Sequence, residues 1–204
     1  MLNLVSLEKK YKDHIVFSNM SIEFTKGNLY ILMGANGSGK STILKLVAGI
    51  IYKSDGKIIK DGIISYLPDK FSMPKLMKVK NYLYEIFYDR KDKNELYVNL
   101  MKTYQIPNKR IGDLSKGNLQ KLGIVQILSL DADIYLFDEP LDGLDDYAKK
   151  VFREAVKEKL KEKKLVLMSL HNKSYFNELN PIVIEVKEGM VYEKKRRKEM
   201  DESN

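Results

Sequence analysis

The sequence predicts an α/β fold with a mainly parallel core sheet, on two observations. First, short apolar runs alternate with segments of helical apolar spacing along most of the 204 residues, which is the pattern of parallel strands joined by helices. Second, residues 29–33 are apolar throughout, as in a strand covered on both faces, and lead directly into a glycine-rich loop. A chain of this length suits one domain, so we expect a single domain over residues 1–204.

The glycine-rich loop is preceded by strand patterns and followed by a helix pattern. Residues 2–7, 15–17 and 20–24 alternate polar and apolar side chains, which predicts short strands of a half-buried sheet. Residues 41–48 have apolar side chains at helical spacing. The loop is therefore predicted to lie between a strand and a helix. Residues 63–67 are a further predicted strand.

The second half of the chain is predicted to begin with helices. Residues 79–89 and 92–104 carry apolar side chains at helical spacing, and we assign them to a helical subdomain of about residues 70–130. Ser115 suits the N-cap of a helix that runs to at least Gln126. The remaining predicted elements are a buried strand at 134–137, an amphipathic helix at 145–163, a strand at 164–170, and a hairpin of strands 182–186 and 190–192 around Glu188 and Gly189.

Composition excludes several classes of protein. The chain has no cysteine, so neither a disulfide framework nor a Cys-ligated metal site is available. The longest apolar run, residues 43–52, is broken by Lys45 and Gly49 and falls short of the roughly 18 residues that a membrane span needs. The start of the chain lacks the apolar stretch of a secretory signal. We therefore expect a cytoplasmic protein.

The net charge of +8 raises the question of an anionic partner. Part of this charge lies in a basic run at residues 194–198, which begins a basic tail of about residues 194–204. Such a run could meet acidic lipid headgroups or nucleic acid. We interpret it as a solvated tail, because charge runs commonly serve solubility.

Residues 34–41 match the phosphate-loop pattern G-x-x-x-x-G-K-[ST] completely. Small residues let backbone amides point at phosphates, and the helix that follows adds its positive end. Lys40 is predicted to reach the outer phosphates and Ser41 to offer its hydroxyl to magnesium. The motif therefore predicts a nucleoside-triphosphate site. Its residues are Gly34, Ala35, Asn36, Gly37, Ser38, Gly39, Lys40, Ser41 and the adjacent Thr42.

Two carboxylates follow the predicted buried strand at 134–137. Asp138 and Glu139 are expected at the carboxyl edge of the sheet, beside the phosphate loop. An aspartate there can hold Mg²⁺ directly or through water, and the adjacent Glu139 can polarise the attacking water. An Asp-Glu pair at a strand end is common by chance, so it gains its significance from the phosphate loop.

The order of these motifs resembles that of the ATP-binding subunit of an ABC transporter, over nearly the whole chain. Residues 114–118, Leu-Ser-Lys-Gly-Asn, resemble the signature sequence of that family, and residues 138–145 resemble its Walker B strand end and D-loop. The resemblance implies the ABC ATPase fold, a P-loop NTPase core with an antiparallel β subdomain and a helical subdomain. It also implies ATP and Mg²⁺ as ligands. Ser115 and Gly117 would cap the ATP of a second ATPase subunit, identical or not, so that ATP closes the dimer and hydrolysis releases it.

The resemblance implies roles for two further residues. His171 follows the predicted strand 164–170 and matches the switch histidine of the family, which would bond the γ-phosphate and act in catalysis with Lys40 and Glu139. Tyr11 lies where the family places an aromatic ring that stacks on adenine. His14, in a predicted polar turn, is expected to have no such role.

Three positions depart from the family pattern. Asp69 stands where the family usually has glutamine. Its carboxylate could touch magnesium beside Ser41 and Asp138, although a negative charge near a triphosphate is unfavourable unless the metal offsets it. In the signature, Lys116 replaces a glycine and Asn118 replaces a glutamine. Because the expected hydrolytic residues are all present, we expect these changes to tune the activity rather than abolish it.

We therefore expect an ATP-hydrolysing subunit that energises a separate membrane-spanning subunit, which it contacts through the helical subdomain. It would lie peripherally at the inner face of the cell membrane and bind no nucleic acid. A short subunit without an added C-terminal regulatory domain favours export of a peptide, drug or lipid-like molecule. One alternative is a soluble ABC ATPase that acts on nucleic acid or the ribosome, although the long coiled-coil insertions or tandem ATPase units of such proteins are not seen. Another is an ATP-binding regulatory module without turnover.

Overall fold

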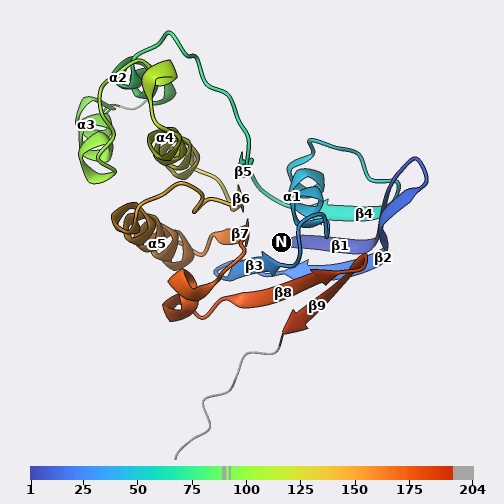
Figure 1. Ribbon diagram of the computed structural model, residues 1–204. Helices are drawn as coiled ribbons and strands as arrows, with labels where there is room; N and C mark the ends of the chain where they lie inside the picture. The colour runs from blue at the N-terminus through green and yellow to red at the C-terminus, as the bar shows by residue number, and fades with distance from the viewer. Residues whose placement is uncertain (89–90, 92, 195–204) are drawn as a thin grey trace, which may run out of the picture.

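The larger of two β-sheets forms the centre of the molecule (Figure 1), for which a computed structural model describes residues 1–88, 91 and 93–194. Within these residues its strands have the order β5-β6-β7-β3-β8-β9. All neighbours pair in parallel except β9, which pairs antiparallel with β8. The predicted α/β fold with a mainly parallel sheet is thus confirmed. The strands are β3 (Leu29–Met33), β5 (Ile64–Leu67), β6 (Ile134–Asp138), β7 (Leu165–Ser169), β8 (Ile182–Lys187) and β9 (Met190–Lys194).

The smaller sheet is antiparallel, with the strand order β2-β1-β4. The two short strands expected at 15–17 and 20–24 are parts of one strand, β2. Strand β4 was not predicted, because its sequence Asp-Gly-Lys-Ile-Ile-Lys lacks a regular alternation. Its Gly56 has φ +83°, and an added Cβ would lie 2.3 Å from the Ser6 oxygen, so the close approach of β4 to β1 depends on glycine. The strands are β1 (Leu2–Tyr11), β2 (His14–Phe24) and β4 (Asp55–Lys60).

Helices cover both faces of the larger sheet (Figure 1). Helix α1 lies on the side of the smaller sheet, and the other helices lie on the opposite side. The helices predicted at 79–89 and 92–104 correspond to α2 and α3, although residues 89 and 92 lie outside the described part. The 3₁₀ segment Ser174–Leu179 was not predicted. The helices are α1 (Lys40–Ala48), α2 (Val79–Ile86), α3 (Lys93–Thr103), α4 (Lys116–Ser129) and α5 (Asp146–Lys161).

The larger sheet buries alternate side chains of each strand on its two faces. On β6, Tyr135 and Phe137 belong to the core on the α5 side, whereas Leu136 belongs to the core beneath α1 and the smaller sheet. Phe137 meets Phe152 of α5 edge to face, with ring centroids 5.1 Å apart. Burial on both faces explains why the strands read as unbroken apolar runs. The dense core also gives the loops at the strand ends a rigid base.

In the described part of the chain no helix is long and apolar enough to span a membrane. The predicted basic tail falls almost wholly on residues 195–204, outside the described residues, and only Lys194 belongs to β9.

Candidate active site

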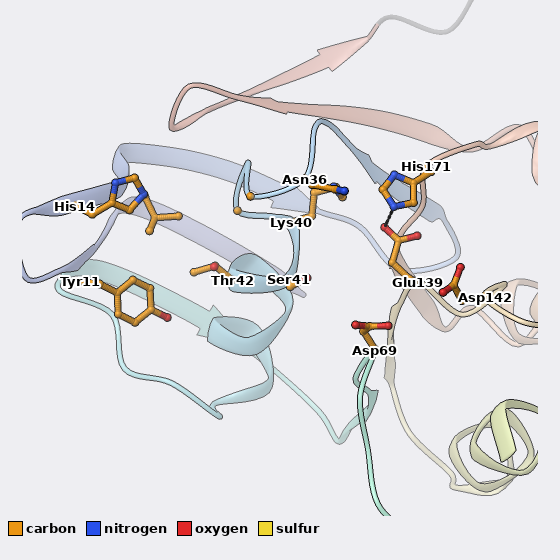
Figure 2. Close-up of a pocket in the computed structure, with 13 residues that line it drawn as sticks. Tyr11, His14, Asn36, Lys40, Ser41, Thr42, Asp69, Glu139, Asp142 and His171 are labelled. Carbon is orange, nitrogen blue, oxygen red and sulfur yellow. Dashed lines mark ion pairs between the residues drawn. The ribbon is translucent and has the colours of Figure 1, made fainter. Parts of the chain in front are cut away.

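A cavity of about 540 Å³ lies where the segments after β3, β6 and β7 meet (Figure 2). These strands are parallel neighbours, so their carboxyl ends lie at the same edge of the sheet. The phosphate loop follows β3, Glu139 follows β6, and His171 follows β7. The hairpin of β1 and β2 forms the far end of the cavity. The lining residues are Tyr11, His14, Val16, Asn36, Gly37, Gly39, Lys40, Ser41, Thr42, Asp69, Glu139, Asp142 and His171.

The phosphate loop bends tightly around the Lys40 side chain. The Lys40 ammonium is buried and donates hydrogen bonds to the carbonyl oxygens of Gly34, at 2.9 Å, and Ala35, at 3.1 Å. Gly39 has φ +106°, and an added Cβ would lie 2.4 Å from Cζ of Phe17, so only glycine fits there. The other predicted loop residues Gly34, Ala35 and Ser38 line an adjoining cavity of about 550 Å³.

Asp138 lies behind the cavity rather than on its wall, with only 2% of its surface exposed. Its Oδ1 accepts hydrogen bonds from the hydroxyls of Ser41, at 3.0 Å, and Ser169, at 2.6 Å. The Ser169 hydroxyl also accepts a hydrogen bond from the backbone N–H of Glu139, at 2.9 Å. Sequence reasoning missed Ser169. The signal that could have found it is a polar residue that ends an otherwise apolar strand.

Glu139 faces into the cavity opposite the phosphate loop (Figure 2). Its Oε1 lies 3.5 Å from Nε2 of His171. Burial raises the pKa of the Glu139 carboxyl, an effect that nearby His171 and Lys40 partly oppose. Glu139 also has φ +49°, a left-handed conformation that is uncommon for a residue with a side chain. A carboxyl with a raised pKa in a cavity is a typical feature of a proton-transfer site.

The opposite end of the cavity is formed by the small sheet. Tyr11 ends β1 and His14 begins β2, and the two are paired across the hairpin. Both line the cavity, and Tyr11 is 47% exposed. The position of His14 in a polar turn did not indicate this. Asp69, which follows β5, lines the same cavity on the side of Glu139 and Asp142 (Figure 2).

The predicted signature residues lie outside the cavity. The Ser115 hydroxyl caps α4, as predicted, by accepting a hydrogen bond from the Asn118 N–H at 3.3 Å. Gly117 packs on the segment after Glu139, since an added Cβ would lie 2.4 Å from the Gly143 oxygen. The Lys116 ammonium contacts Oδ2 of Asp142 at 3.1 Å. The start of α4 therefore forms one unit with residues 140–145.

A family model described as "ABC transporter" matches residues 17–142, which include the phosphate loop, the signature segment and Glu139. The chain belongs to the ABC transporter family. Its fold and motif order make it a nucleotide-binding subunit of that family, and it is an ATPase.

The relatives of this ABC protein include both import and export proteins. It is 34% identical over 179 residues to the cytochrome c biogenesis ATP-binding export protein CcmA of Reclinomonas americana. This match covers 77% of this chain and 78% of the relative. It is 30% identical over 183 residues to the zinc import ATP-binding protein ZnuC of Wolbachia sp. subsp. Brugia malayi. That match covers 85% of this chain and 74% of the relative. The dimeric post-hydrolysis structure of the ATP-binding cassette MJ0796 bound to ADP and Pi matches its fold with a TM-score of 0.84. That match covers 97% of this chain and all of the other, at 20% identity.

Proposed function

We propose that the cavity binds ATP with its phosphates on the loop after β3 and its base on Tyr11. One observation carries this proposal: three neighbouring parallel strands bring Lys40, Glu139 and His171 to one cavity, whose far end holds an exposed aromatic ring. A triphosphate needs cationic and N–H donors, and a purine needs a flat apolar face. The cavity offers both at its two ends (Figure 2).

Hydrolysis in this site would depend on Glu139. Its carboxylate would orient a water molecule and accept a proton from it as the water oxygen attacks the γ-phosphorus. His171, 3.5 Å from Glu139, would hold the γ-phosphate and keep the carboxylate in place. Lys40 would exchange its two carbonyl partners for phosphate oxygens and so stabilise the charge that leaves with ADP.

The residues present also fit a magnesium ion. The Ser41 hydroxyl and the Asp138 carboxylate lie 3.0 Å apart, and hard oxygen donors of this kind are the ligands that Mg²⁺ prefers. Asp69 lines the same cavity and would add a second carboxylate. When bound, the metal would offset the negative charge of the phosphates.

We propose further that the active form is a dimer with a second ATPase subunit, of the same or another chain. Ser115 and Gly117 lie at a helix start outside the chain's own cavity. A helix start can offer a hydroxyl and free amides to an anion. They would therefore serve the ATP of the partner, and ATP would favour the closed pair. The dimeric cassette whose fold this chain shares supports the arrangement.

The proposed place of action is the cytoplasmic face of the membrane, on a separate membrane-spanning subunit, with export as the favoured direction. The relatives include proteins of both directions, an export protein at 34% identity and an import protein at 30%, so a transport assay decides the direction. We propose no nucleic-acid partner. The alternative, action on the ribosome or on nucleic acid, makes a different prediction about where the protein is found.

Cell fractionation tests this proposal. The tagged wild-type chain, expressed in the organism from which it comes, should sediment with membranes. In mild detergent it should co-purify with a protein that has membrane-spanning segments. Membrane vesicles that carry both proteins should move their cargo away from the ATP side. Sedimentation with ribosomes in the presence of ATP, without a membrane partner, would favour the alternative. ATP-driven uptake toward the cytoplasmic side would overturn the export proposal alone.

A further inference from the structure

A lysine ammonium lies on the aromatic ring that we assign to the base. The Nζ atom of Lys9 is 4.2 Å from the centroid of the Tyr11 ring, well within the distance at which a cation is attracted to an aromatic face. Both residues belong to β1. Tyr11 is half exposed at the end of this strand, so contacts within the smaller sheet are needed to fix its orientation.

Lys9 is itself held in place. Its ammonium donates a hydrogen bond to the carbonyl oxygen of Tyr52, at 2.8 Å. The segment that supplies this oxygen is bonded to β1 twice more. The Ser54 N–H donates to the Glu8 oxygen at 2.8 Å, and the Ser54 hydroxyl accepts from the Lys10 N–H at 3.0 Å. The ammonium is therefore placed on the ring by a fixed support rather than by a free side chain.

Tyr11 lines the cavity, whereas Lys9 does not. From this we infer that the ammonium lies on the face of the Tyr11 ring turned from the cavity, which leaves the other face open to a base. A cation on one face draws π-electron density away from the other, which reduces its repulsion toward a stacked base. A ring that is already ordered also loses less entropy when a base binds.

We propose that Lys9 is a positioning residue for the nucleotide base: it holds Tyr11 in the stacking orientation and strengthens the stack from behind. This inference rests on the proposed nucleotide site. It concerns the base alone, because Lys9 has no place among the residues around the phosphate loop. Its effect should therefore appear with ATP and vanish with inorganic tripolyphosphate, which carries the phosphates without a base.

The test compares Lys9→Met with Lys10→Met. Lys10 is the next residue, its side chain is 57% exposed, and its ammonium contacts Glu8 at 3.7 Å, so the control removes the same charge nearby. Isothermal titration of ATP should show about 2- to 5-fold weaker binding for Lys9→Met and unchanged binding for Lys10→Met. Tripolyphosphate should bind the wild type, Lys9→Met and Lys10→Met equally. In turnover assays Lys9→Met should raise KM for ATP without a change in kcat. Lys9→Arg should retain the wild-type affinity and KM.

A double-mutant cycle with Tyr11→Leu completes the test. In the Tyr11→Leu background the Lys9→Met substitution should have no further effect on ATP affinity, because the ring through which Lys9 acts is gone. If Tyr11→Leu weakens ATP binding and Lys9→Met does not, the inference about Lys9 fails and the proposed site stands. If Tyr11→Leu leaves ATP binding unchanged, the proposed base site itself fails. Equal losses of ATP and tripolyphosphate binding in Lys9→Met would show a general loss of folding and also overturn the inference.

Discussion

The Nε2 atom of His171 lies 3.5 Å from Oε1 of Glu139, although 32 positions of sequence separate the two residues. The contact exists because β6 and β7 are parallel neighbours, paired through Asp138 and Ser169. The residue that follows each strand by one or two positions must then lie at the same edge. The proposed proton acceptor and the proposed hydrogen-bond donor for the γ-phosphate are thereby placed together.

Replacement of Glu139 by glutamine should separate ATP binding from hydrolysis. The amide cannot accept the proton of the attacking water, so turnover of ATP should fall by at least about 100-fold. Binding should remain, and gel filtration with ATP and magnesium should show a dimer. The control is Glu154→Gln on the surface of α5, which should turn over ATP at the wild-type rate. Turnover by the Glu139 variant, or a monomer at saturating ATP with every candidate partner chain, would contradict the proposed mechanism.

The pH dependence of the protein should report the raised pKa of Glu139. The proposed mechanism requires the carboxylate form of Glu139, so kcat should fall as the pH falls, with a midpoint above the ordinary 4.5 of a glutamate. Stability should respond in the opposite sense. The native state keeps the Glu139 proton longer than the unfolded state, so this residue costs stability as pH rises through that window. The free energy of unfolding of Glu139→Gln, measured in urea, should exceed that of the wild type at pH 7 and approach it at pH 4.

Asp69 should affect metal-free and metal-bound nucleotide in opposite ways. Its carboxylate shares the cavity with the phosphate loop. Asp69→Asn removes one negative charge, so ATP should bind roughly 5-fold tighter in EDTA, as expected for about 1 kcal/mol between charges 4 Å apart in water. The Mg²⁺ concentration for half-maximal turnover should rise. Asp61→Asn, outside the cavity, is the charge-matched control. No change in either quantity would remove Asp69 from the site.

An alanine at Gly117 should displace the signature segment, none of whose residues lines the proposed ATP cavity of the same chain. The added Cβ would lie 2.4 Å from the Gly143 oxygen, so the start of α4 must move away from residues 140–145. Turnover should fall roughly 10- to 100-fold, whereas a fluorescent ATP analogue should bind the isolated subunit normally. Gly112→Ala, where the nearest atom is 3.1 Å away, is the matched control. Normal turnover in Gly117→Ala would argue against a role of this segment in trans.

Asp145 should stabilise the fold in two separable ways. Its Oδ1 accepts the Ala148 N–H at 2.7 Å and caps α5, and its Oδ2 contacts the buried Lys121 ammonium at 2.7 Å. Asp145→Asn keeps the cap but loses the ion pair and leaves Lys121 buried without its carboxylate. Asp145→Ala loses both and should be less stable still, by about 1 kcal/mol in urea unfolding. Asp13→Asn is the control for charge, and equal stability of the two Asp145 variants would exclude the cap.

The pH dependence of this pair has a definite sign. The ion pair with Lys121 lowers the pKa of Asp145, and the Ala148 N–H lowers it further. The resulting stabilisation is present above the pKa of the unfolded aspartate and is lost as pH falls through the lowered native value. The free energies of unfolding of the wild type and Asp145→Asn should therefore become equal at acidic pH.

Much of the fold was predictable because its signals are local. Residues 29–33 form β3 as expected, since an apolar run buried on both faces needs no information from elsewhere in the chain. The positions of Lys40 and Asp138 followed from a loop motif and from a strand end in the same way. These are cases in which sequence neighbours determine the structure.

The features that were missed depend on contacts between distant segments. Strand β4 exists because Gly56 can approach Ser6, 50 positions earlier. His14 reaches the cavity only because the β1–β2 hairpin packs beside the phosphate loop. Ser169 gains its partners from the end of the neighbouring strand. None of these contacts leaves a periodic pattern in the sequence, which is why pattern reasoning did not find them.

The hydrogen bonds through Ser169 run in one direction. A hydroxyl has one proton, and Ser169 uses it toward Asp138 while it accepts the N–H of Glu139. Bonds arranged in such a series polarise one another, so the backbone dipole of Glu139 reinforces the donor that faces Asp138. The Asp138 carboxylate and the backbone N–H of Glu139 are thus linked by hydrogen bonds through Ser169, which lies on another strand. A displacement of the Asp138 carboxylate by a cation would be transmitted along this path to the backbone that carries Glu139.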